Sequence, residues 1–70
     1  MTLREAKKLR AGDTFKRPSA NTHDAGFRAY TVIERNPTFI TVQDEHGYVS
    51  RTHWEYRSTV KHLFEFAIKG

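Results

Sequence analysis

The chain has 70 residues, enough for a single small domain that we expect to span residues 1–70. It holds 12 Lys and Arg against 8 Asp and Glu, which gives a formal net charge of +4, and it has no cysteine. This composition excludes a disulfide scaffold, a thiolate zinc site and a thiol nucleophile. No apolar run approaches the roughly 20 residues of a membrane span, so we expect an intracellular protein without a membrane partner.

A short helix and its cap are predicted for residues 1–12. Thr2 and Glu5 have the spacing of a capping box, in which each side chain accepts a hydrogen bond from the other residue's backbone amide. The apolar residues that follow recur on one helical stripe: Leu3, Ala6 and Leu9. Gly12 is placed to end the helix, because glycine adopts the left-handed conformation at little cost. About eight residues are too few for a helix that is stable alone, so we expect it to dock through the stripe.

The pattern of residues 13–69 is typical of five short antiparallel strands. The predicted strands cover residues 13–17, 27–35, 39–44 and 48–56, with a last strand inside 60–69. A polar loop at 18–26 and turns at 36–38, 45–47 and 57–59 connect them. Alternation along these strands places the following large side chains in the core: Phe15, Val32, Ile40, Val42, Phe64 and Phe66.

The predicted fourth strand leaves two interpretations of Trp54 open. Under strict alternation, with Val49 pointing inward, Trp54 and Tyr56 point outward and form an exposed aromatic stripe with Tyr48. A bulge near residues 51–52 would instead turn Trp54 into the core. The two interpretations differ in whether the aromatic rings can reach a ligand.

Three segments resemble the small SH3-like barrels of bacterial and phage proteins. They are residues 9–13 (LRAGD), residues 30–34 (YTVIE), and residues 40–44 (ITVQD) leading into Gly47. The resemblance covers residues 9–50. It implies a mainly β protein, a five-stranded antiparallel SH3-like barrel over residues 13–69 preceded by a short N-terminal α-helix, in the cytoplasm of a bacterial or phage-infected cell. Such barrels include nucleic-acid binders, peptide binders and inhibitors, so the resemblance assigns no functional residue.

The residue pattern favours a protein that is not an enzyme and has no metal or cofactor. The four histidines have none of the spacings of a metal site: His23, His46, His53 and His62. The glycines stand singly, so the chain has neither a phosphate-binding loop nor a dinucleotide fingerprint. The serines have no strained turn or partnered histidine, and a chain of this size leaves little volume for a substrate pocket. We therefore predict no catalytic residue.

Cations and aromatic residues are the remaining candidates for function. The first 20 residues carry the whole net charge, because residues 21–70 hold equal numbers of cations and carboxylates. The predicted binding residues in this basic segment are Arg4, Lys7, Lys8, Arg10, Lys16 and Arg17. A second group, in which aromatic residues alternate with cations, follows within ten residues: Tyr48, Arg51, Trp54, Tyr56 and Arg57. Cations attract phosphates, and exposed aromatic rings stack with bases.

Two functions fit these residues. The first is a nucleic-acid-binding accessory protein anchored by the basic segment. The alternative is a phage or mobile-element adaptor or inhibitor that binds and blocks a host protein, because Trp, Tyr and Arg also dominate protein interfaces. The expected partner is nucleic acid or an acidic protein surface, and a homodimer is compatible with both functions.

Overall fold

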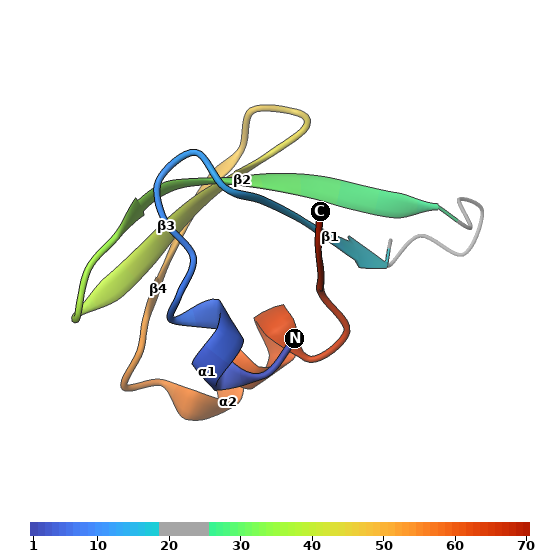
Figure 1. Cartoon of the computed structure of the whole chain (residues 1–70). Helices are drawn as coiled ribbons and strands as arrows, with labels where there is room; N and C mark the ends of the chain where they lie inside the picture. The colour runs from blue at the N-terminus through green and yellow to red at the C-terminus, as the bar shows by residue number, and fades with distance from the viewer. Residues whose placement is uncertain (19–25) are drawn as a thin grey trace.

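The computed structural model describes residues 1–18 and 26–70. Within these ranges the chain forms two helices and five strands in the order α1, β1, β2, β3, β4, α2, β5 (Figure 1). Their bounds are Leu3–Ala6 for α1, Thr14–Pro18 for β1, Phe27–Arg35 for β2, Phe39–Asp44 for β3, Val49–His53 for β4, Arg57–Phe64 for α2 and Ile68–Lys69 for β5. Neither helix in this part of the chain is long and apolar enough to cross a membrane.

The five strands form one antiparallel sheet in the order β4-β3-β2-β1-β5. In its register, Phe15 of β1 lies opposite Tyr30 of β2, and Val32 of β2 lies opposite Val42 of β3. Strands β4 and β5 are the two edges, so the sheet is open. The predicted closed barrel is therefore wrong, although the mainly β class, the five antiparallel strands and the N-terminal helix are confirmed.

The end of the chain accounts for the open sheet. Residues 57–64, predicted as a turn and the start of a strand, form α2, and only residues 68–69 remain as β5. Val60, Phe64 and Ala67 recur at helical spacing, and all three are buried. Phe66, predicted as core, is 70% exposed. Burial of the helical set thus prevails over the strand alternation of residues 64, 66 and 68, and the shortened last strand cannot close the sheet.

The core lies between the sheet and the two helices, which cover one of its faces (Figure 1). Five of the six predicted core side chains are buried there: Phe15, Val32, Ile40, Val42 and Phe64. The Phe15 ring stacks on that of Tyr30 and tilts against that of Phe64, with both centroid distances 5.3 Å. Ala6 and Leu9 of the predicted helical stripe are also buried, which docks the N-terminal segment on the same core.

The capping box and the turn signals are confirmed, but Gly12 does not end the helix as predicted, because α1 ends at Ala6 and Lys7 is its C-cap. The Thr2–Glu5 capping box is formed, although α1 itself is only four residues long. Asn36 Oδ1 accepts hydrogen bonds from two amides in the turn before β3, and Asp44 Oδ1 does the same in the turn before β4. Gly12 and Gly47 have φ of 95° and 91°, which only glycine adopts without strain. The predicted loop at 18–26, with His23, falls mostly outside the described residues.

Candidate functional site

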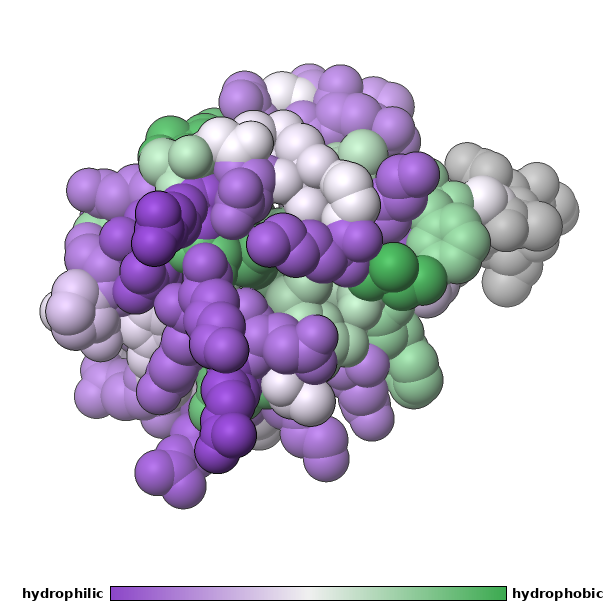
Figure 2. Space-filling model, viewed as in Figure 1, coloured by the Kyte–Doolittle hydropathy of each residue, from purple (hydrophilic) through white to green (hydrophobic). Residues whose placement is uncertain are grey.

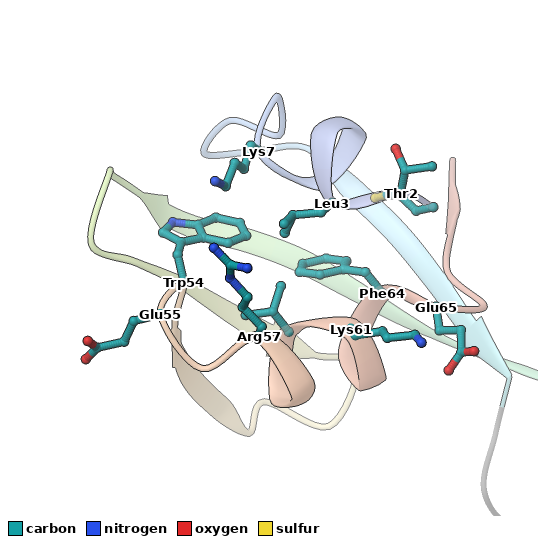
Figure 3. A pocket seen from close by; sticks show the side chains of 11 residues that line it. Thr2, Leu3, Lys7, Trp54, Glu55, Arg57, Lys61, Phe64 and Glu65 are labelled. Carbon is teal, nitrogen blue, oxygen red and sulfur yellow. The ribbon is translucent and has the colours of Figure 1, made fainter.

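A pocket of about 650 Å³ lies between α1 and α2 (Figure 3). Its lining comes from the chain's first residues, the segment after β4, and α2 with the residue that follows it: Met1, Thr2, Leu3, Lys7, Trp54, Glu55, Arg57, Val60, Lys61, Phe64 and Glu65. Helices α1 and α2 contact each other on one side of the sheet, and the pocket lies between them. Ligand sites in proteins have volumes of about 300–1,000 Å³, so its size fits a small ligand or one group of a larger one.

Two aromatic rings form the inner wall of the pocket. The rings of Trp54 and Phe64 are tilted by only 16°, with centroids 6.3 Å apart. Trp54 is 9% exposed, so it belongs to the core and the outward aromatic stripe is wrong. The predicted bulge near residues 51–52 is also wrong, because β4 pairs regularly with β3 and ends at His53, before Trp54. Its Nε1 donates to the Asn36 carbonyl at 2.7 Å and its amide to the Thr38 carbonyl at 3.0 Å, which fixes the indole against the turn before β3.

Cations stand at the mouth of the pocket. Lys7, the residue that ends α1, and Arg57, the first residue of α2, reach toward Trp54 from opposite sides (Figure 3). The Glu55 carboxylate points away from the pocket, whereas Lys61 and Glu65 lie at the other end, beyond Phe64. Positive charge therefore collects at the Trp54 end.

The cationic surface continues along α1. A shallower hollow beside the pocket is lined by Leu3, Arg4, Lys7 and Lys8. Together the two hollows define a helical cation face: Arg4, Lys7, Lys8, Arg57 and Lys61. All five residues are exposed.

None of these cations forms an ion pair with a carboxylate in the described part of the chain, although Thr2 hydrogen bonds and, more weakly, charges that include Lys8 lower the pKa of Glu5. Within residues 1–18 and 26–70, no Lys or Arg approaches a carboxylate to within 4.0 Å, and the one ion pair joins His46 to Glu45 at 3.9 Å. Glu5, which lies among the cations of α1, accepts a hydrogen bond from the Thr2 amide at 3.0 Å. That bond, with a second one to the Thr2 hydroxyl, lowers the pKa of Glu5. The Glu5 carboxylate is thus held by the Thr2 backbone amide.

The predicted binding residues divide among several places. Arg4, Lys7, Lys8, Trp54 and Arg57 gather at the pocket and the hollow beside it, where they are joined by Lys61, Leu3 and Phe64, which the sequence-based prediction missed. Had residues 57–64 been assigned to a helix, the spacing of Arg57 and Lys61 would have placed both cations on one face.

The other predicted residues lie outside the helical cation face. Arg10 is in the turn after α1, and Lys16 is on the side of the sheet away from the helices. Arg17 and Arg51 pack on rings, 5.7 Å from the centroid of Tyr30 and 4.2 Å from that of Phe39. Two exposed tyrosines complete this set, Tyr48 before β4 and Tyr56 before α2. None of these residues lines the pocket or the hollow beside it.

Hydrophobic side chains gather at a corner of the sheet formed by β1, β2 and β5 (Figure 2). Ile68 lies opposite Lys16, and Phe27 lies opposite Pro18 on the next row of the same sheet face. We group Phe27 and Ile68 with the exposed Phe66, which precedes β5 in the chain, as the apolar corner; Phe27 and Ile68 are 53% and 57% exposed. Because Phe15 points into the core, its neighbour Lys16 and the residues aligned with it face away from the helices.

No family model, curated protein or solved structure matches the chain. Among the described residues, no group of three His, Asp or Glu side chains is placed to hold a metal ion. The arrangement is therefore a small five-stranded antiparallel sheet with a cationic, aromatic-walled pocket on its helical side and an apolar corner on the other. A fold of this kind does not determine a function, whereas the chemistry of the two surfaces limits the partners that they suit.

Proposed function

We propose that the protein is a small, non-catalytic cytoplasmic module that binds nucleic acid through its helical cation face. The observation that carries the proposal is that Arg4, Lys7, Lys8, Arg57 and Lys61 surround adjoining hollows on two neighbouring helices, and that none of them has a carboxylate partner within the described residues. Unpaired surface cations release the counterions of a polyanion when they bind it, and this release supplies most of the sequence-independent affinity.

The geometry also suits an extended polyanion better than a single anion. The cations are distributed along α1 and across to α2. A single phosphate would contact one or two of them, whereas successive phosphates of a nucleic acid reach several. The net charge of +4 adds a long-range attraction that speeds encounter at low salt.

The proposal is tested by fluorescence anisotropy with labelled oligonucleotides at salt concentrations from about 50 to 200 mM. We expect affinity to fall with salt by about 0.7 log units per log unit of salt for each single-strand phosphate contact, and by about 0.9 for duplex. Replacing Lys7→Glu together with Lys8→Glu should weaken binding by about tenfold or more, because two contacts are lost and two repulsive charges appear.

A matched control separates location from net charge. The pair Lys16→Glu and Lys69→Glu makes the same change in charge at exposed residues of β1 and β5, neither of which lines the pocket or the hollow beside it. We expect this control to weaken binding much less than the α1 pair. Equal losses in the two double variants would contradict a localised site, and no binding by the parent protein at low salt would contradict the proposed function.

A second candidate function is supported by the apolar corner. Phe27, Phe66 and Ile68 each expose more than half of their surface, and Phe27 and Ile68 belong to the face of the sheet away from the helices. Grouped apolar residues of this kind are typical of protein-binding surfaces. This surface suits the adaptor or inhibitor hypothesis, with binding to a host protein through Phe66 and its neighbours instead of through Trp54.

A further inference from the structure

We infer that the pocket between α1 and α2 receives one unpaired base of a single strand, so that the ligand class is single-stranded nucleic acid. This inference rests on the proposed function, because it assumes that phosphates bind the helical cation face. It adds a second, apolar component that phosphate contacts alone do not provide. The three features that lead to it are the volume of the pocket, its walls and the position of its cations.

The walls of the pocket are those of a site for a flat ring. Trp54 and Phe64 lie nearly parallel on the inner side, where they are 9% and 1% exposed, and Leu3, which is 42% exposed, adds accessible aliphatic surface. Figure 3 shows the Leu3 side chain directed into the space beside Phe64. The volume of about 650 Å³ admits a purine or pyrimidine ring. Aromatic side chains pack with every base regardless of sequence, since each base has a π-face.

The cations are placed for the phosphates on either side of such a base. Lys7 and Arg57 approach the Trp54 end from opposite helices, so a strand that passes between them can present one phosphate to each. Glu55 is directed away from this end, and Glu65 lies at the far end beside Lys61. A neutral ring inside and anionic phosphates at the mouth match the distribution of charge in the pocket.

A duplex cannot use the pocket in this way. Its bases are paired and stacked inside the helix, and only its phosphates reach the protein unless a base is flipped out at a cost of unpairing. A duplex bound to the helical cation face would leave Trp54 unaffected. Because Trp54 is the chain's single tryptophan, its fluorescence reports directly on the pocket.

The experiment compares three probes on the intact protein: a dT12 single strand, an abasic strand with the same number of phosphates, and a 12-base-pair duplex. We expect dT12 to quench Trp54 fluorescence and to bind about tenfold tighter than the abasic strand, since stacking of one base is worth about that factor. The abasic strand and the duplex should bind with steep salt dependence and leave the tryptophan signal unchanged.

A pocket-filling variant and its matched control test the location. Leu3→Phe enlarges a side chain that is 42% exposed inside the pocket, and Ile33→Phe enlarges one that is 43% exposed on β2, away from the pocket. We expect Leu3→Phe to lower the dT12 affinity to that of the abasic strand, whereas Ile33→Phe should leave the preference intact. Circular dichroism establishes that both variants are folded, and the comparison of probes on the parent protein stands without them.

The outcomes distinguish this inference from the function on which it rests. Equal binding of dT12 and the abasic strand, with no change in Trp54 fluorescence, would overturn the base pocket and leave phosphate binding in place. No binding of any probe would overturn both. Stronger quenching by a five-residue acidic peptide with a central phenylalanine than by dT12 would assign the pocket to a protein ligand and would also overturn the inference.

Discussion

Phe64 and Phe66 stand two residues apart and occupy opposite environments. Phe64 is fully buried between the rings of Phe15 and Trp54, whereas Phe66 is 70% exposed. Replacing Phe64→Ala should lower the free energy of unfolding by about 3–5 kcal/mol, because the core loses a large ring and retains a cavity. Phe66→Ala should change it by about 0.5 kcal/mol or less. Urea denaturation followed by circular dichroism measures both free energies of unfolding. Similar decreases in the two variants would contradict the finding that Phe64 is buried and Phe66 is not.

Trp54 illustrates why a single residue can be predicted only in part. Its alternation with Tyr56 and Val49 allowed both an outward and an inward position. The deciding factors are distant in sequence: the carbonyls of Asn36 and Thr38, which accept its two N–H groups, and the ring of Phe64. No local pattern around residue 54 contains them. The sequence therefore identified Trp54 as a candidate site residue but could not place it as a pocket wall.

The capping box of α1 makes this helix sensitive to acid. The hydrogen bond from the Thr2 amide to the Glu5 carboxylate lowers the pKa of Glu5 below its ordinary value. A lowered pKa in the folded state means that the contribution to stability is present above the ordinary pKa and is lost as the pH falls through the lowered one. We expect the NMR signal of the Thr2 amide to shift with this lowered pKa during an acid titration.

A Glu5→Gln variant is the control for that titration. Glutamine also accepts the hydrogen bond of a capping box but does not ionise in this range. The Thr2 amide should then keep its position without an acid transition. An unchanged transition in the variant would mean that another group, and not Glu5, causes it.

The elements of the chain differ in how far local patterns determine them. Strands β1, β2 and β3 follow closely from alternation and from the turn residues Asn36 and Gly47, because these signals act within a few residues. Residues 57–69 carry two valid patterns, a strand alternation and a helical spacing. The choice between them depends on docking of Val60 and Phe64 against a core built mostly from earlier residues. The same choice places Lys61 at the candidate site. Because the sequence did not predict α2, it also did not predict Lys61 as a site residue.

The molecule separates its two candidate surfaces on opposite sides of the sheet. The helices with their cations cover one face, whereas Phe27 and Ile68 of the apolar corner face the other way, because they align with Pro18 and Lys16 and not with Phe15. The separation means that the two proposed functions can be removed independently by substitution.

Substitutions at the apolar corner test the second function. Phe66→Ser with Ile68→Ser removes two exposed apolar side chains and should leave oligonucleotide affinity unchanged, since neither residue lines the pocket or the adjoining hollow. If the corner binds a host protein, the parent protein should recover a nuclease-resistant partner from a bacterial lysate, and this variant should not. The expected loss of binding free energy is about 2 kcal/mol or more. The Lys7→Glu and Lys8→Glu pair should retain that partner and mainly slow its association. The corner could instead bind a second copy of the chain, which gel filtration of the purified protein tests. A dimer that the serine variant converts to a monomer would assign the corner to this second copy.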